Sequence, residues 1–328
     1  MPWIIERYIR AGQSGFTPAK LAQATLALAE MQLGTIRVRS MPFVLRIEPC
    51  NVCNLRCPLC LCGNRRDTRP KGMMALDDFR QVLERTSKWA MITRLDGLGE
   101  PTQHPQIFEL VRIAKSYGTS VVMHTNLETA NCTHPEPFLE SGLDRLVVSV
   151  DGADQETHER YRTGGNLETV VRRLRSLVEA RRRRGQRRPI LEMQTIDFDF
   201  NRNQQPALRE LSRSIGVDRY QVTSVQRSLE LSHYEPGRPK RCPWLWTVLS
   251  VAWNLDYRSC TNAWSFAWPH RNMRELPPES FWNSRAMQDA RQYNLGQTSK
   301  SIASDPGCRC NRCYEMMVVP LRGEYTCD

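Results

Sequence analysis

The sequence lacks any segment that would carry the chain into or through a membrane. The apolar run of about 7 to 15 residues that marks a signal peptide is missing from its start. No later apolar run approaches the roughly 20 residues of a membrane-spanning helix. We therefore expect a cytoplasmic protein with no membrane partner.

Acidic and aromatic residues are scarce where basic residues gather. The chain has 46 Lys and Arg against 35 Asp and Glu, a net charge of +11. Nine arginines fall within residues 172–188, where Glu179 is the one acid. Such a run is typical of a solvated outer helix face, although it can also bind nucleic acid or another anionic partner. Because no aromatic residue lies among these arginines, nucleic acid is the less favoured partner.

Cysteine is plentiful, and its distribution indicates metal binding. Thiols stay reduced in the cytoplasm, so 12 cysteines that gather in local groups are expected to be metal ligands sooner than disulfides.

The order of predicted elements indicates an α/β protein. A length of 328 residues with 40% hydrophobic residues is enough for a buried core. Short β-rich runs alternate with amphipathic segments, which is typical of βαβ units and a parallel sheet. Strands are predicted at 43–48, 92–98, 120–125, 145–150, 190–196 and 219–224, and helices at 18–31, 76–88, 106–117, 167–183 and 204–215.

Three cysteines follow the first predicted strand with the spacing C-x3-C-x2-C: Cys53, Cys57 and Cys60. Three thiolates are one too few for a four-iron, four-sulfur cluster, so this spacing leaves one iron open to another ligand. An open metal position indicates catalysis, as it does at zinc sites. Cys50 and Cys62 lie nearby, and a closed cluster or zinc site that includes Cys50 is the alternative.

This spacing, with the residues Cys-Asn-Leu-Arg-Cys, resembles the motif of the radical S-adenosylmethionine (radical SAM) enzymes. The resemblance implies that Cys53, Cys57 and Cys60 hold a 4Fe-4S cluster and that SAM chelates its open iron. It also implies that an electron donor such as flavodoxin or ferredoxin drives cleavage of SAM to methionine and a 5'-deoxyadenosyl radical. Where the family often has an aromatic residue against the adenine, this chain has Leu59.

The resemblance extends to the fold and to the other strand ends. Six strands fit the partial (β/α)6 TIM-like barrel of the family. The segment 96–101 is similar to the family's Gly-Gly-Glu-Pro motif, so Gly99 and Glu100 are implied contacts of the SAM ammonium group. Ser149 and Asp151 match a Ser-x-Asp-Gly segment that reaches the ribose hydroxyls, and Asn126, at the end of the third strand, joins them.

Other polar residues near strand ends are candidates without an assigned role. His124 is either a proton carrier or a structural histidine. Gln194, Thr195 and Asp197 would face the substrate in one orientation of their strand, and alternation alone does not fix that orientation. The catalytic acid or base is therefore unassigned.

A second group of cysteines follows a segment rich in proline and glycine at 232–240. Its order resembles the SPASM and Twitch extensions of radical SAM enzymes, which hold auxiliary iron-sulfur clusters. The resemblance implies a second 4Fe-4S cluster on four cysteines: Cys242, Cys260, Cys310 and Cys313. Cys308 and Cys327 are unassigned. A zinc ribbon is the alternative. The family usually has a glycine where this chain has Leu255, which predicts a different hairpin bend.

These observations predict three parts: a helical extension at 1–40, the radical SAM barrel at 41–235, and a small α+β iron-sulfur domain at 236–328. The extension is too short for the winged-helix domain by which many relatives recognise peptides.

The resemblance implies abstraction of a hydrogen atom from a substrate carbon. We expect dehydrogenation of a hydroxyl-bearing small molecule, with the auxiliary cluster as electron acceptor. The alternative within the same chemistry is crosslinking or epimerisation of a peptide. From another class, a non-catalytic iron-sulfur or zinc protein would use the arginine run to bind nucleic acid.

Overall fold

One β-sheet organises the molecule. The structure, a computed structural model, describes residues 16–224, 242–258 and 271–297. Within these residues eight strands form a single sheet in the order β6-β5-β4-β3-β2-β1-β7-β8. Neighbouring strands run parallel, except that β8 is antiparallel to β7. The strands are β1 (Val44–Ile47), β2 (Ile92–Leu95), β3 (Ser120–Thr125), β4 (Arg145–Ser149), β5 (Ile190–Asp197), β6 (Arg219–Ser224), β7 (Val248–Val251) and β8 (Tyr257–Arg258).

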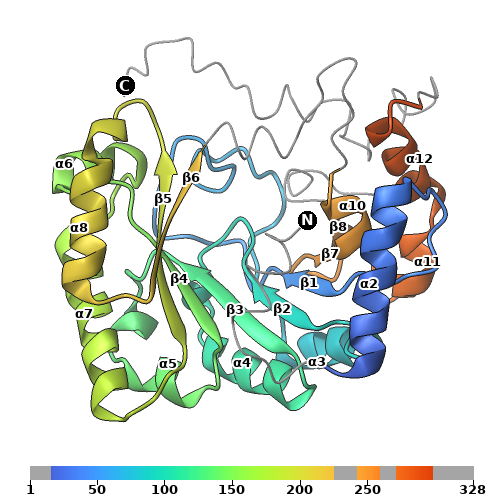
Figure 1. The fold of residues 1–328 in the computed structure, drawn as a ribbon, viewed down its shortest axis with the longest axis horizontal. Coiled ribbons are helices and arrows are strands. Elements are labelled where there is room, and N and C mark those ends of the chain that lie inside the picture. Colours follow the sequence, from blue (N-terminus) through green and yellow to red (C-terminus); the bar gives the residue numbers. More distant parts are fainter. Residues whose placement is uncertain (1–15, 225–241, 259–270, 298–328) are drawn as a thin grey trace.

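Helices cover the outer face of the curved sheet, with α3, α4, α5, α7 and α8 following its strands around the outside (Figure 1). The α-helices are α2 (Pro18–Leu33), α3 (Leu76–Thr86), α4 (Ile107–Ser116), α5 (Glu136–Glu140), α6 (Gln155–Tyr161), α7 (Leu167–Arg183), α8 (Gln205–Ile215), α10 (Trp244–Thr247), α11 (Pro278–Trp282) and α12 (Arg285–Asn294). Short 3₁₀ helices are η1 (Pro101–Gln103), η2 (Ala130–Cys132) and η3 (Arg202–Gln204). None of the helices in the described ranges is long and apolar enough to cross a bilayer.

The hydrophobic core lies between the sheet and these helices. Successive strand residues point to opposite faces, so Leu45 and Ile47 of β1 face the helices while Arg46 faces the other way. Leu45, Ile47 and Met123 are completely buried in the core. The opposite face, which we call the inner face, carries many of the sheet's charged side chains.

All six predicted strands and the predicted helices are present in the structure. β2 ends at Leu95, earlier than predicted, because the chain turns from Asp96 onward. The α/β class and the parallel sheet are confirmed, and the description of the sheet as a partial (β/α)6 barrel stays a prediction.

Two further strands extend the sheet beyond β1. β7 pairs with β1 in parallel, with Val44 opposite Val248, and β8 returns beside it. The predicted boundary near residue 235 falls outside the described residues. The described part beyond it shares the first sheet, and the division of the chain into three parts stays a prediction.

The segment between α2 and β1 is held by residues from the far end of the chain. Trp246 Nε1 donates to the Thr35 carbonyl over 2.9 Å. The Asn283 amide exchanges hydrogen bonds of 3.0 and 2.9 Å with the Val38 backbone. The buried Arg291 donates to the Ile36 carbonyl over 2.9 Å. These contacts attach α10, α11 and α12 to the segment between α2 and β1.

The arginine run forms the last turns of α7 and the loop that follows. Several of its members make structural contacts: Arg181 pairs with Asp218 at 2.5 Å, and Arg184 pairs with Glu140 at 2.9 Å. Cations at a helix carboxyl end are also favoured by the helix dipole. Since α7 ends where β5 begins, the run lies at the amino-terminal edge of the sheet, opposite the edge at which the predicted site lies.

The bend between β7 and β8 corrects the expectation for Leu255. Leu255 has φ of 69°, the left-handed conformation that a glycine would adopt without strain, so the bend is compatible with the family's glycine. Its side chain is completely buried, and its amide donates to the Ala252 carbonyl over 2.9 Å. Burial of the leucine therefore compensates the backbone strain.

We expect Leu255→Ala to destabilise the protein more than Leu255→Gly does. Both variants lose the buried side chain, at about 2–5 kcal/mol, but only glycine relieves the left-handed strain of about 1–2 kcal/mol. At Leu249, a buried residue of β7, the order should reverse because glycine costs more than alanine in a strand. Thermal melting of the four variants measures this, and the same order at both positions would contradict it.

Candidate functional site

The three motif cysteines lie on the loop that follows β1, at the carboxyl edge of the parallel sheet. The Cys60 amide donates to the Cys57 carbonyl over 3.1 Å, which closes a tight turn between them. Gly63 packs on this turn, because a Cβ there would lie 2.5 Å from the backbone nitrogen and oxygen of Cys57. The loop also contacts the connection between α6 and α7, since the Arg56 amide donates to the Thr163 carbonyl over 2.9 Å.

The environment of the thiols is largely apolar. Cys57 belongs to a small cluster with Leu55, Tyr161 and Phe198, against which Cys53 also packs. Burial raises the pKa of both Cys53 and Cys57, so in the metal-free protein these groups are neutral thiols at pH 7. Iron would have to displace their protons on binding.

The cysteine loop fits a cluster better than a single ion. Across the described residues, no three histidine, cysteine, aspartate or glutamate side chains converge closely enough to hold one metal ion. A four-iron cube binds each thiolate at a different corner, so its ligands need not converge on one point. The Leu55 amide lies 3.4 Å from Cys53 Sγ and points a donor at it, as suits a thiolate ligand. The donor type and the apolar surroundings therefore fit an iron-sulfur cluster.

Cys50 and Cys62, the neighbouring cysteines, have protein partners. Cys50 Sγ donates to the Glu100 carbonyl over 3.2 Å, and burial raises its pKa to about 12. Cys62 Sγ donates to the Asn51 carbonyl over 3.4 Å, and burial raises its pKa to about 11. In this structure both thiols stabilise the ends of the loop through hydrogen bonds.

Gly99 and Glu100 join the turn after β2 to the cysteine loop. The Glu100 amide donates to the Val52 carbonyl over 2.8 Å. A Cβ on Gly99 would collide with the Cys50 carbonyl oxygen and would lie 2.7 Å from that of Val52. Glycine is therefore required at this close approach of two backbones.

The Glu100 carboxylate points into the protein. It accepts from Thr102 Oγ1 at 2.6 Å, Thr125 Oγ1 at 2.7 Å and the Asn126 amide at 2.8 Å. Burial raises its pKa. An ammonium group would have to compete with these donors for the carboxylate, whose visible role is to join the ends of β2 and β3.

Asn126 ties the end of β3 to the cysteine loop. Its amide nitrogen Nδ2 donates to Asn54 Oδ1 over 2.9 Å, while its Oδ1 accepts from the Glu128 amide at 2.9 Å. Asn54 lies between Cys53 and Cys57, so this contact fixes the loop at its centre.

Ser149 and Asp151 end the fourth strand. Ser149 is half-buried, whereas Asp151 is completely buried and accepts from Arg162 Nε at 2.5 Å and from the Ile196 amide at 2.6 Å. The structure thus brings the five predicted SAM contacts to one edge of the sheet, around the cysteine loop.

Arg162 is a residue of this site that sequence reasoning missed. Its guanidinium pairs with Asp151 and lies beside Cys57, whose pKa it lowers against the larger effect of burial. Burial alone would lower the pKa of Arg162, but the charge and hydrogen bond of Asp151, together with the charges of Cys57 and Tyr161, raise it. No local spacing marks this arginine, because its partners come from two other strand ends.

Charged and polar residues line the inner face below this edge. Arg46 of β1 is in register with Arg94 of β2, and both pair with Asp96. His124 Nε2 lies 3.3 Å from Arg94 and 3.7 Å from Asp96. The ring of Trp244, from α10, lies 5.5 and 5.9 Å from the two guanidinium groups. Burial alone would raise the pKa of Asp96, but Arg46 and Arg94 hold it below its usual range.

The same face carries polar groups on β4 and β5. Arg145 pairs with Glu192, and both are almost completely buried. Gln194 lies two residues further along β5, half-buried and nearer the carboxyl edge. The predicted candidate Gln194 therefore lies on the inner face of the sheet. Thr195 points to the opposite face and donates to the Val150 carbonyl at 2.5 Å.

Of the second cysteine group, only Cys242 lies within the described residues. It precedes α10, and its amide donates to Asn294 Oδ1 over 2.8 Å. Cys260, Cys308, Cys310, Cys313 and Cys327 lie outside them.

Comparisons with known proteins agree with this geometry. Residues 47–197 match the family model described as the radical SAM superfamily. The tungsten-containing aldehyde ferredoxin oxidoreductase cofactor-modifying protein of Pyrococcus furiosus is 27% identical over 185 residues, which are 55% of this chain and 51% of that protein. The chain thus spans about half the length of this curated relative.

Two solved structures share the fold. Streptococcus suis SuiB bound to precursor peptide SuiA has a TM-score of 0.65 and 14% identity, covering 89% of this chain and 76% of SuiB. BtrN in complex with AdoMet and 2-DOIA has a TM-score of 0.51 and 11% identity, covering 82% of this chain and 92% of BtrN. These two structures show the shared fold alone, and it is the match of residues 47–197 to the family model, taken with the cysteine loop at the end of β1, that shows a radical SAM superfamily domain in this part of the chain.

Proposed function

We propose that Cys53, Cys57 and Cys60 hold a 4Fe-4S cluster that binds SAM, and that the enzyme oxidises a polar small molecule. The observation that carries the proposal is the position of three thiols on one loop at the carboxyl end of β1, joined by hydrogen bonds to the turns after β2 and β3. This edge of a parallel sheet is where ligands bind.

When bound, the cluster and SAM would supply a 5'-deoxyadenosyl radical that abstracts a hydrogen atom from the substrate. The residues of the chain prepare the site for them. Asn126 fixes the centre of the loop through Asn54, and Gly99 lets the turn after β2 lie against it. Tyr161 and Phe198, whose ring centroids are 4.5 Å apart, pack beside Cys57 and exclude water from it.

Gly99, Glu100, Asn126, Ser149 and Asp151 remain our proposed SAM contacts. The half-buried Ser149 offers a hydroxyl that suits a ribose diol. The carboxylates of Glu100 and Asp151 already accept several hydrogen bonds within the protein. We therefore propose that these two side chains orient the turns whose other atoms contact SAM.

The polar inner face supports a polar substrate. Arg94 and His124 lie on β2 and β3 below the predicted SAM edge, Asp96 directly follows β2, and the His124 side chain is 21% exposed. Such groups would bind hydroxyl, carboxylate or amino groups in preference to an apolar molecule. His124 is a partly exposed imidazole on this face, which keeps it a candidate base for the oxidation.

Modification of a peptide is the second candidate. It is favoured by the fold shared with SuiB, which was solved with a precursor peptide and matches 89% of this chain. The cofactor-modifying relative instead supports a substrate that is not a peptide.

An oxidation needs an electron acceptor. For that role we propose an auxiliary 4Fe-4S cluster on Cys242, Cys260, Cys310 and Cys313, with flavodoxin or ferredoxin as electron donor to the first cluster.

Anaerobically reconstituted protein should form 5'-deoxyadenosine from SAM and a strong reductant. A variant with Cys53, Cys57 and Cys60 all changed to alanine should form none, because the open cluster loses its ligands. Cys132→Ala is the control, since Cys132 is buried outside the cysteine loop and shares a hydrogen bond with Thr129 Oγ1. Equal product from the triple variant would contradict the proposed cluster site.

Iron content tests the second cluster separately. We expect about eight irons per wild-type chain and about four in the triple-alanine variant, because each cube holds four irons. Cys242→Ala should lower the wild-type content by up to the other four. A triple variant free of iron would remove the auxiliary cluster, and with it the proposed electron acceptor.

Gly99→Ala should lower 5'-deoxyadenosine formation about tenfold or more while most of the iron stays bound, as expected when a supporting backbone contact is displaced. The added methyl meets two backbone carbonyls, so the turn after β2 must move away from the cysteine loop. Gly118→Ala is a matched control, because its surroundings are open and only its backbone is strained. Activity of Gly99→Ala equal to that of the control would show that this turn does not contact SAM.

A further inference from the structure

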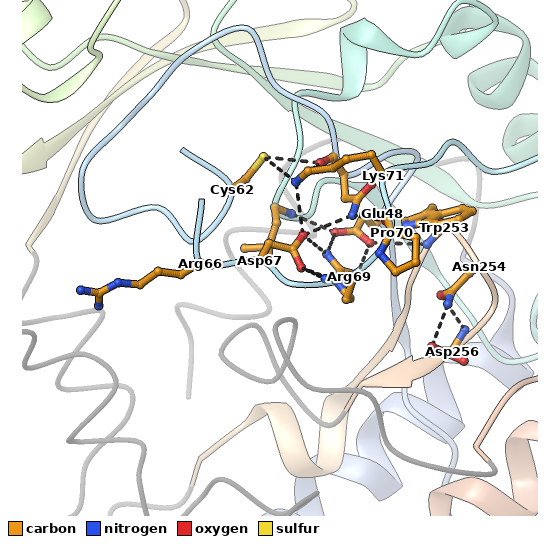
Figure 2. A network of polar contacts seen from close by, with 12 residues as sticks. Glu48, Cys62, Arg66, Asp67, Arg69, Pro70, Lys71, Trp253, Asn254 and Asp256 are labelled. Carbon is orange, nitrogen blue, oxygen red and sulfur yellow. Dashed lines mark hydrogen bonds and ion pairs between the residues drawn. The ribbon is translucent and has the colours of Figure 1, made fainter. Parts of the chain in front are cut away.

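The cysteine loop is closed at its base by a buried ion pair. Glu48, directly after β1, is completely buried and faces Arg69 on the returning chain. Arg69 Nη1 and Nη2 donate to the two oxygens of Glu48 over 2.8 and 2.9 Å (Figure 2). This two-point contact joins the ends of a segment that contains all three motif cysteines, so we call Glu48, Asp67 and Arg69 the loop clasp.

Asp67 holds the other edge of the same guanidinium. Arg69 Nε and Nη2 donate to its two oxygens over 2.8 and 2.9 Å. Asn51 then links both sides of the loop base, because its Nδ2 donates to Asp67 over 3.2 Å and its Oδ1 accepts from the Gly72 amide at 2.8 Å. Burial alone would lower the pKa of Arg69, but its hydrogen bonds to Glu48 and Asp67 raise it.

The clasp also contacts two other parts of the molecule. The Leu98 amide, in the turn after β2 that is predicted to contact SAM, donates to Glu48 Oε1 over 3.2 Å. The Trp253 amide, in the bend between β7 and β8, donates to Glu48 Oε2 over 3.5 Å. The Trp253 ring covers Gly72, where a Cβ would lie 2.6 Å from one of its ring carbons. Figure 2 shows Trp253 beside the clasp.

A buried ion pair of this kind contributes geometry more than stability. The cost of removing both charges from water offsets much of their attraction. The planar fork of arginine, however, fixes the direction of two carboxylates at once, which lysine cannot do. Here the fixed directions are those of the two ends of the cysteine loop.

We propose that Glu48 and Arg69 are positioning residues for the iron-sulfur cluster, which they serve by holding the cysteine loop in its ligand-binding conformation. The proposal rests on the proposed cluster site at Cys53, Cys57 and Cys60. Through Glu48, the same clasp fixes the position of the cysteine loop relative to the turn after β2 and to the bend between β7 and β8.

Arg69→Lys and Arg69→Met test the clasp, with Arg145→Lys and Arg145→Met as matched controls. Arg145 is also buried, pairs with the buried Glu192, and lies on β4 outside the loop. All four reconstituted full-length proteins are treated with an iron chelator, and the rate of loss of the cluster's visible absorption is measured. Thermal melting of the metal-free proteins reports the cost to the fold.

Both sets should melt at lower temperature than the wild type, but only the Arg69 variants should lose the cluster faster, by about tenfold or more, as expected for a residue that orients metal ligands. The EPR signal of the reduced cluster, and its change on addition of SAM, should also differ from the wild type only in the Arg69 variants. The conservative lysine variant keeps the test available if the methionine variant does not fold.

Equal rates of cluster loss in the Arg69 and Arg145 variants of similar melting temperature would overturn the proposal, because the clasp would then serve only stability. A wild-type protein with no SAM-sensitive EPR signal would instead overturn the proposed function. The two failures are therefore distinguishable.

Discussion

Buried carboxylates at the ends of the strands determine how this site is built. Glu48 follows β1, Glu100 follows β2 and Asp151 follows β4, and each is almost completely buried. A carboxylate removed from water must be supplied with donors, so each one draws a neighbouring loop toward it. Glu48 receives Arg69, Glu100 receives the end of β3, and Asp151 receives Arg162 and β5. The loops around the cysteines therefore have few alternative positions.

The two faces of the sheet have different tasks because a strand alternates its side chains. The helix-covered face supplies the apolar core, and the inner face carries the charges of Arg46, Arg94 and Arg145 with their carboxylate partners. Apolar side chains of the strands thus gather on one face, and these charged side chains gather on the other. The carboxyl edge, where the loops begin, joins the two and is the place where a cofactor and a substrate would meet.

The arginine run is separated from this site. The arginine run ends α7, at the amino-terminal edge of the sheet, and Arg181 and Arg184 form ion pairs there. An electron donor that docked on this run would face the wrong end of the sheet for transfer to the cysteine loop. These pairs give members of the run a structural role, and Arg181 is buried in its contact with Asp218.

The sequence by itself determined six of the eight strands in the described residues and the helices between them, and it predicted the cluster ligands. The strand and helix positions follow from local periodicity, and Cys53, Cys57 and Cys60 are recognisable by spacing alone. Only the tertiary structure decided the partners: Arg69 for Glu48, Arg162 for Asp151, the inward turn of the Glu100 carboxylate, the pairing of β7 with β1, and the left-handed conformation of Leu255. The reason is physical, because periodicity is a property of neighbouring residues, whereas a buried charge or a strained bend is satisfied by groups that approach only when the whole sheet has formed.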